Sequence, residues 1–245
     1  MSEETFTVTV VPLDKDLVMG PICTFISGTV LGTPGSVFIA NAWDVLLQMA
    51  PGAPKSKDDW KAPMDQYKNR PTPTDCTFVT LNSNRDRLDY VRGGLGQLKN
   101  KTFYGVCNGF TWVTTSILVA TKYPAPFKNQ TALLPSGTRV ETYGIKGIKA
   151  EEHMFTVVNR ALGSDDGDYR TWGTDCFAVD QWYALQTGTH PVKALTAGTF
   201  YDAAFIQWWN RTVPGTRPAK MPGSFMSNKF VSMFEFHTGE FLPEF

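Results

Sequence analysis

One stretch of the sequence restricts the possible folds of this chain more than any other: TFYGVCNGFTWVTTSILVATKY, at residues 102–123. It carries no acidic or basic residue up to Thr121, and every odd position from Thr111 to Thr121 is β-branched. Such side chains pack well on a pleated sheet and lose rotamer freedom in a helix. Asn108-Gly109 stands before this run, and Asn-Gly favours a tight hairpin turn in which the glycine takes a positive φ. The pattern therefore predicts an antiparallel hairpin whose second strand is long and central.

Periodicity and turn residues divide the rest of the chain into further predicted elements. Strands are expected at residues 5–10, 21–31, 76–81, 138–148, 199–209 and 229–236. Helices are expected at residues 37–49, 84–98, 150–162 and 176–186. Many short strands joined by long loops rich in proline and glycine are typical of a β-sandwich. We therefore predict a mainly β fold, an antiparallel, jelly-roll-like β-sandwich with a few inserted short helices, formed by residues 1–245 as a single domain.

The composition excludes some partners and favours others. The 245 residues carry 23 basic and 23 acidic side chains, and only 19% of the residues are charged. Nonspecific binding to nucleic acid needs clustered lysine and arginine, so direct nucleic-acid binding is not expected. Weak self-repulsion favours a homo-oligomer. No apolar run is long enough for a membrane span, and the acidic N-terminus lacks the apolar core of a secretory signal.

The cysteines and histidines are few and widely spaced. The cysteines are Cys23, Cys76, Cys107 and Cys176, and the histidines are His153, His190 and His237. They form neither a CxxC pair nor an HExxH motif, so no metal site is predicted. We expect all four thiols to be reduced and structural. A nucleophilic site that joins Cys107 or Cys176 to His153 in space stays open as an alternative.

Two short segments contain residue types that are used in ligand sites. Asp165-Asp166-Gly167-Asp168 could offer carboxylates to calcium, but it lacks the spacing and the closing glutamate of an EF-hand, so we predict a solvated turn. Gly93-Gly94-Leu95-Gly96 matches no phosphate-binding fingerprint, and the chain contains no GxSxG elbow. The sequence therefore predicts no cofactor and no catalytic motif.

Aromatic residues make up 13% of the chain. They are more numerous than is needed to cover one face of each predicted strand. Aromatic side chains are favoured as anchors in subunit interfaces. The interface candidates are Trp60, Trp208, Trp209 and Phe245. In an alternative role, tryptophan rings would stack against sugars, and the candidates for this are Trp172, Trp182, Trp208 and Trp209.

In its overall texture the sequence resembles a jelly-roll capsid protein of the picorna-like kind. The shared features are one β-rich domain of this size, a neutral composition rich in threonine and aromatic residues, and long loops punctuated by prolines. The resemblance implies a structural subunit of a viral capsid rather than an enzyme. It would assemble with itself or with related capsid subunits in the host cytoplasm, reside in the virion, and could bind a host glycan or receptor. The basic N-terminal arm of many RNA-virus coat proteins is missing, which argues against direct genome binding.

Two other functions stay open beside the capsid subunit. One is a carbohydrate-binding β-sandwich, either a lectin or a capsid spike, in a secreted or extracellular protein. The other is a hydrolase whose site is assembled from dispersed cysteine and histidine residues. The absence of any nucleophile motif argues against the hydrolase, and the candidate pair for it is the one named above.

Overall fold

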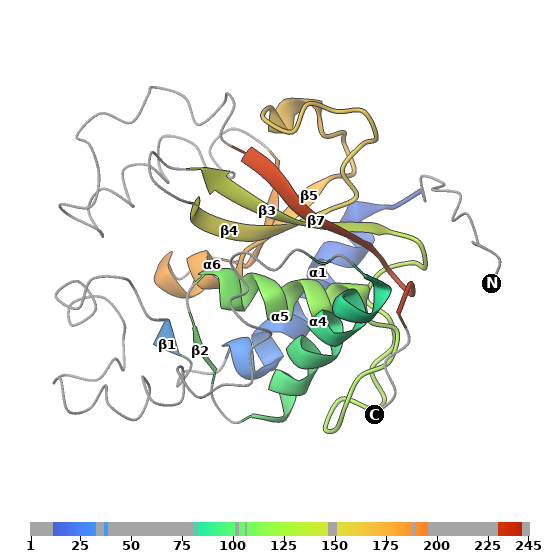
Figure 1. Cartoon of the computed structure of the whole chain (residues 1–245), viewed down its shortest axis with the longest axis vertical. Helices are drawn as coiled ribbons and strands as arrows, with labels where there is room; N and C mark the ends of the chain where they lie inside the picture. Colours follow the sequence, from blue (N-terminus) through green and yellow to red (C-terminus); the bar gives the residue numbers. More distant parts are fainter. Residues whose placement is uncertain are drawn as a thin grey trace, which may run out of the picture.

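A five-stranded antiparallel sheet with helices packed on one face dominates the computed structural model of the protein (Figure 1). The structure describes residues 12–32, 37–38, 81, 83–100, 103–105, 107–146, 151–187, 190–195 and 230–241. The strand order is β6-β5-β4-β3-β7. These strands are β3 (Arg139–Lys146), β4 (Glu151–Val158), β5 (Phe177–Val179), β6 (Val192–Ala194) and β7 (Phe230–His237). A separate parallel pair joins β1 (Val37–Phe38) to β2 (Tyr104–Gly105).

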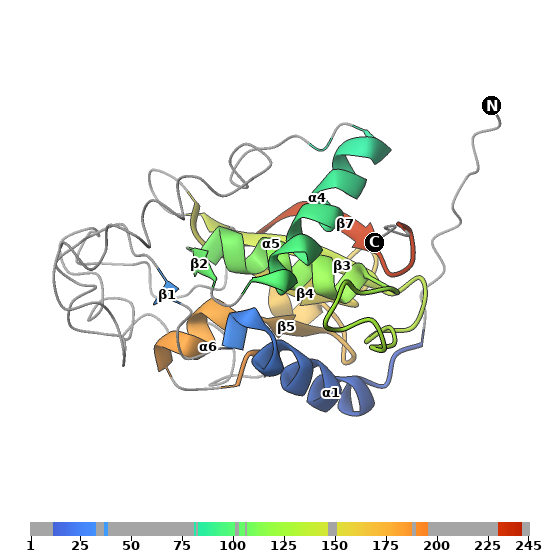
Figure 2. The same ribbon diagram turned by 90° about the horizontal axis from the view of Figure 1, so that it is seen from below.

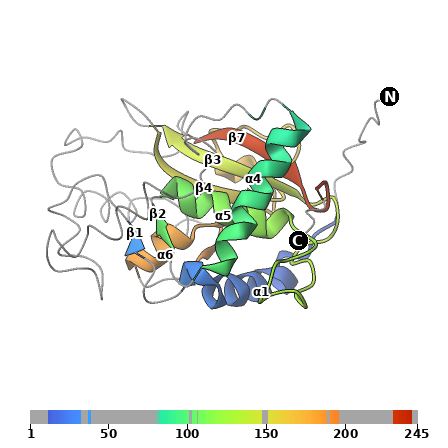
Figure 3. The ribbon, with the colours of Figure 1, turned by 60° about the horizontal axis from the view of Figure 1, so that its bottom comes forward.

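The helices lie together in front of the sheet when the molecule is seen from below (Figure 2). They are α1 (Lys15–Gly28), α4 (Asn84–Gly96), α5 (Cys107–Val119) and α6 (Gln181–Thr187), with short 3-10 helices at Val30–Gly32, Gln97–Lys99 and Tyr169–Thr171. Helix α5 packs on β3 and β4, and α4 crosses α5 and reaches β7, where the Tyr90 ring stacks on the Phe236 ring (Figure 3). Among the described residues, no helix combines the length and the apolar character that crossing a membrane requires.

Helix α5 is the centre of the core, because every residue from Asn108 to Val119 is buried. The predicted hairpin is therefore wrong, and Gly109 lies inside the helix and not at a turn with positive φ. A helix that is buried on every side needs apolar or small residues all round, and this demand overrides the weak intrinsic preference of β-branched residues for strands. Periodicity alone cannot separate such a helix from a buried strand.

Helix α4 approaches α5 closely because two of its glycines leave room for side chains of α5. A Cβ on Gly94 would lie 2.1 Å from Ser116 Oγ, and a Cβ on Gly93 would lie 2.8 Å from the Trp112 ring. Trp112 Nε1 also donates a hydrogen bond to the carbonyl oxygen of Tyr90 at 2.7 Å. The glycines that weaken the helix in isolation therefore form its packing surface.

The other predicted elements have mixed outcomes. The helix expected at 84–98 and the strands expected at 138–148 and 229–236 are confirmed by α4, β3 and β7. The strand expected at 21–31 is wrong, because α1 covers most of it. The helix expected at 150–162 is also wrong, because β4 takes its place. The segment expected to be a helix at 176–186 contains strand β5 and then helix α6. Residues 37–38 of the helix expected at 37–49 form β1. The strands expected at 5–10 and 199–209, most of the strand expected at 76–81 and the rest of the 37–49 helix lie outside the described residues.

The prediction of a mainly β, jelly-roll-like sandwich is wrong. Among the described residues, those in helices outnumber those in strands. A sandwich requires two sheets that face each other, whereas the larger sheet of this protein has α5 and its neighbours on one face. The protein therefore belongs to the mixed α and β class in its described part.

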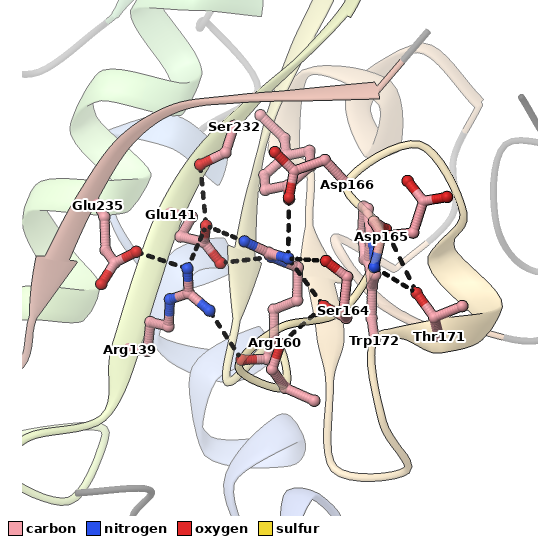
Figure 4. A network of polar contacts seen from close by, with 12 residues as sticks. Arg139, Glu141, Arg160, Ser164, Asp165, Asp166, Thr171, Trp172, Ser232 and Glu235 are labelled. Atoms are coloured by element: carbon pink, nitrogen blue, oxygen red, sulfur yellow. Dashed lines mark hydrogen bonds and ion pairs between the residues drawn. The ribbon is translucent and has the colours of Figure 1, made fainter. Parts of the chain in front are cut away.

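The face of the sheet away from α5 carries a buried ionic network (Figure 4). The Glu141 carboxylate is fully buried and accepts two hydrogen bonds from Arg160, both at 3.0 Å. It also accepts bonds from Arg139 at 3.1 Å and from Ser232 at 2.8 Å. Arg160 reaches on to Asp166 at 2.9 Å. Since all of these groups are paired, the network is structural: it ties β3, β7 and the connection between β4 and β5 together.

Candidate functional site

Cys107 is the first residue of α5, and this end of α5 lies beside α6 (Figure 1). Its thiol is free and half-buried. Because the first N–H groups of a helix have no acceptor inside the helix, the N-terminus of α5 favours negative charge on a group placed there.

His153, near the start of β4, is the ring whose pKa the Cys107 side chain affects. Its side chain is only 1% exposed. The Cys107 side chain helps to raise the pKa of the His153 ring. His153 Nε2 lies 2.5 Å from Asp180 Oδ2. Asp180 thus engages the ring through Nε2, and Nδ1 is its other nitrogen.

Asp180 is held in place by the elements on both sides of it. It follows β5 directly and precedes α6, and its Oδ1 accepts a hydrogen bond from Tyr183 N at 2.9 Å, as an N-cap side chain does. The Asp180 N–H donates to the carbonyl oxygen of Pro191 at 2.8 Å. The carboxylate therefore has one oxygen fixed by the backbone and the other directed at His153.

The electrostatics of this arrangement favour a charged imidazole. Burial alone would lower the pKa of His153, but the Asp180 carboxylate and, to a smaller extent, Cys107 raise this pKa to about 10. In the folded protein the ring therefore holds a second proton over the whole neutral range. A buried imidazolium favours negative charge on a group beside it.

Two aromatic rings enclose the His153–Asp180 pair. The centroid of the Trp182 ring lies 5.1 Å from that of the His153 ring. The Phe155 ring stacks on the His153 ring, with the two centroids 6.2 Å apart. Trp182 is itself only 6% exposed. These rings keep water from the hydrogen bond between His153 and Asp180, which strengthens the bond.

The structure separates the two cysteines that the sequence offers as partners of His153. Cys107 is the one that contributes to the raised pKa of His153. Cys176 is 1% exposed, and burial raises the pKa of its thiol, so it stays protonated and inert. Cys23 lies 3.3 Å from His190 Nδ1 on the surface, but no carboxylate among the described residues is paired with His190. Cys76 lies outside the described residues.

Sequence reasoning missed Asp180, the third member of the site. The signal available was the order along the chain: a cysteine, then a histidine, then an acid that directly follows the short apolar run Cys176–Val179 and precedes Gln181-Trp182. Such residues are adjacent in the fold and not in the sequence, so spacing cannot select them. Without the fold, Asp180 is one of many acidic residues.

The acidic turn at residues 165–168 has its carboxylates engaged inside the protein. Asp165 Oδ1 accepts a hydrogen bond from Gly167 N at 2.8 Å, and Asp168 Oδ2 pairs with Arg170 at 2.6 Å. Asp166 belongs to the ionic network described above. Within the part of the chain that the structure describes, no group of three or more histidine, cysteine, aspartate or glutamate side chains could hold a metal ion.

The aromatic candidates fall into two sets. Trp172 is fully buried, and its Nε1 donates to the carbonyl oxygen of Asp165 at 2.8 Å, while Trp182 covers His153. Neither ring presents an open face to a sugar. The interface candidates Trp60, Trp208, Trp209 and Phe245 all lie outside the described residues.

Comparison of the chain with protein-family models, curated proteins and solved structures finds no match. The functional proposal therefore rests on the His153–Asp180 pair and on Cys107 at the start of α5.

Proposed function

We propose that this protein is a cysteine hydrolase that cleaves amide or ester bonds through a thioester on Cys107. The observation that carries the proposal is the buried His153 ring, which Asp180 holds at 2.5 Å through Nε2, together with the contribution of Cys107 to the raised pKa of that ring. A nucleophile, a histidine and an orienting carboxylate are the three roles that nucleophilic catalysis requires.

The residues would act in two half-reactions. The Cys107 sulfur attacks the carbonyl carbon of the substrate while the proton of the thiol resides on His153. The C–N or C–O bond then breaks, the imidazolium gives this proton to the leaving group, and the thioester remains. Water attacks the thioester, His153 takes a proton from the water and returns it to the sulfur, and the acid leaves. Asp180 keeps the ring oriented and stabilises the imidazolium throughout.

The N-terminus of α5 supplies a candidate oxyanion site. The negative oxygen that forms during each attack needs hydrogen-bond donors next to the nucleophile. The backbone N–H of Cys107 belongs to the first turn of α5 and has no acceptor within the helix. The helix that carries the nucleophile therefore also favours the charge that develops beside it.

The three roles correspond to those in papain-like cysteine proteases, in which a cysteine, a histidine and a third polar residue follow in the same order along the chain. This is an analogy of roles at one site, and it supports amide bonds as the substrate class. It says nothing of a common family.

The other expectations from the sequence stay predictions. The capsid subunit and its place in the virion were inferred together with a sandwich fold, which the described residues do not have. No observation bears on assembly with copies of this chain or with related subunits. The same is true of a glycan-binding role and of a location outside the cell. The expectation that the chain is not an enzyme also stays untested, and the geometry of Cys107, His153 and Asp180 favours the hydrolase.

A generic acyl donor tests the proposal without knowledge of the natural substrate. On mixing with p-nitrophenyl acetate, the wild-type protein should release a burst of nitrophenolate and carry an acetyl thioester on Cys107, found by peptide mass spectrometry. Cys107→Ser should abolish the burst. Cys23→Ser is the matched control, because this thiol is also partly exposed and lies 3.3 Å from a histidine nitrogen, and it should change nothing. A burst that survives Cys107→Ser, or acetyl groups on Cys23 alone, would contradict the proposal.

A further inference from the structure

The side chain of Asn108, the residue after Cys107, lies across the N-terminal end of α5. Its Oδ1 accepts a hydrogen bond from the backbone N–H of Gly109 at 2.7 Å. The N–H groups of the first turn point out of the N-terminal end of a helix, so an acceptor for the Gly109 N–H must lie off this end. The amide group of Asn108 is therefore placed at the end of the helix that carries Cys107.

The same hydrogen bond fixes the orientation of the Asn108 amide. A backbone N–H can only donate, so the side-chain atom that it faces is the carbonyl oxygen, and Nδ2 takes the other position. Asn108 is only 6% exposed, so the amide is held by packing as well as by this bond. No described residue accepts a hydrogen bond from Nδ2, and this atom keeps a narrow exposure to solvent. Asn108 therefore presents a fixed donor group that a ligand can reach.

Two backbone donors share this helix end with the Asn108 amide. The N–H groups of Cys107 and Asn108 belong to the first turn of α5 and have no acceptor within the helix. The preceding residue in the sequence is Val106, whose side chain has no atom that accepts a hydrogen bond. Among the described residues, no group is recorded as an acceptor for either N–H. The N-terminal end of α5 therefore combines two backbone N–H groups with one side-chain amide, next to the Cys107 thiol.

The proposed reaction supplies an anion for these donors. When the Cys107 sulfur attacks a carbonyl group, the carbonyl oxygen becomes an oxyanion on the carbon that is bonded to the sulfur. Donors that are already held in place before the attack stabilise this charge without reorganisation. Asn108 meets this condition, because burial and the bond from the Gly109 N–H hold its amide.

We propose that Asn108 is a catalytic residue, which donates a hydrogen bond from Nδ2 to the oxyanion that forms on the substrate of Cys107. This inference rests on the proposed function, because the oxyanion forms only if Cys107 is acylated. It assigns part of the oxyanion site to a side chain, which a substitution can remove. It also separates two reactions of the same thiol, since acylation passes through an oxyanion and alkylation by iodoacetamide does not.

Two variants of the full chain separate the donor from a merely structural role of the side chain. Asn108→Asp keeps an oxygen for the Gly109 N–H and adds negative charge at a helix N-terminus, so it should be at least as stable as the wild type. It has no donor in place of Nδ2. Asn108→Ala removes the acceptor and the donor together. The control is Asn84→Ala, which removes an exposed asparagine from the start of α4.

Denaturant unfolding confirms that each variant is folded, and the rates of acylation by p-nitrophenyl acetate and of alkylation by iodoacetamide are then measured at Cys107. We expect kcat for acylation to fall about 100-fold in both Asn108 variants, with little change in KM, as for the loss of one oxyanion donor. Asn108→Ala should still be alkylated at nearly the wild-type rate. Asn84→Ala should match the wild type in both reactions.

A folded Asn108→Asp that acylates at the wild-type rate would overturn the inference, because the side chain would then only cap α5. Equal losses of acylation and alkylation in Asn108→Ala would overturn it too. A wild-type protein that does not acylate Cys107 would instead contradict the proposed function. Acetate then tests the donor alone: in NMR spectra at constant ionic strength, the side-chain amide of Asn108 should shift as acetate is added and that of Asn84 should not. An Asn108 amide that does not respond would overturn the inference as well.

Discussion

The charge of Asp180 controls the protonation of His153, and Asp180→Asn isolates this effect. The amide keeps the shape of the carboxylate and can still contact His153 Nε2 and accept from Tyr183 N. Without the charge, burial should return the pKa of His153 to its usual value near 6.5 or below. We expect acylation of Cys107 to slow at least about tenfold at pH 7, measured with p-nitrophenyl acetate. An unchanged rate would show that Asp180 has no part in the reaction.

The raised pKa of His153 also predicts how stability depends on pH. Because the folded-state pKa is about 10 and the unfolded value about 6.5, the stabilisation from this pair is fully present below about pH 6.5 and is lost as the pH rises towards 10. The gap in unfolding free energy between the wild type and Asp180→Asn should therefore be widest near pH 6, on the order of a few kcal/mol, and narrow by pH 10. Denaturant titrations at pH 6, 8 and 10 measure it, with Cys107→Ser as the control for the thiol. A gap that widens with pH would refute the account.

The residues of the site were only partly predictable from the sequence. Cys107 and His153 are among very few residues of their types, so the sequence could name the pair, together with Cys176 as a competitor. Burial and geometry, which the sequence does not contain, then separate Cys107 from Cys176. Asp180 has no such rarity, and its role depends on the antiparallel pairing of β4 with β5, in which Thr156 lies opposite Val179.

Among the elements, the contact of α4 with α5 makes the clearest prediction. Gly94→Ala would place a Cβ 2.1 Å from Ser116 Oγ and 2.6 Å from Ser116 Cβ, so we expect a loss of about 1–3 kcal/mol of stability from overpacking. Gly96→Ala, in the same helix, meets nothing within 4 Å and should be neutral or stabilise by about 0.5–1 kcal/mol. Thermal or denaturant unfolding compares the two. Equal effects would mean that α4 does not approach α5 as closely as described.

Two elements explain why the predicted fold class was wrong. The buried helix α5 has no polar face to reveal a helical period, and its β-branched residues favour a strand locally. Strand β4 is buried on both faces from His153 to Val158, so it shows no alternation, and the acidic residues at its start resemble the first turn of a helix. Where an element has one polar face or a clear cap, as α4 does at Ser83, the prediction is confirmed.

At the scale of the whole molecule, the ionic network around Glu141 joins parts that are far apart in the sequence. Glu141→Ala would leave the guanidinium groups of Arg139 and Arg160 buried without this carboxylate, and we expect a loss of about 3–5 kcal/mol in unfolding free energy. The control is Arg170→Ala, which removes a pair with Asp168 that is exposed on the arginine side, and it should leave stability nearly unchanged. Denaturant titrations compare the two variants. A cost for Glu141→Ala as small as that for Arg170→Ala would show that the network does not hold β3, β7 and the β4–β5 connection together.

The central claim, that Cys107, His153 and Asp180 work as one unit, is tested most directly by the rate at which iodoacetamide alkylates each cysteine at pH 6. Only the thiolate reacts, so the rate reports how far the surroundings stabilise it, and peptide mass spectrometry assigns it to each residue. We expect Cys107 to react at least about tenfold faster than Cys23, with Cys176 inert, and His153→Ala, checked for folding, to remove this advantage. A Cys107 that reacts no faster than Cys23, or equally fast with and without His153, would contradict the account.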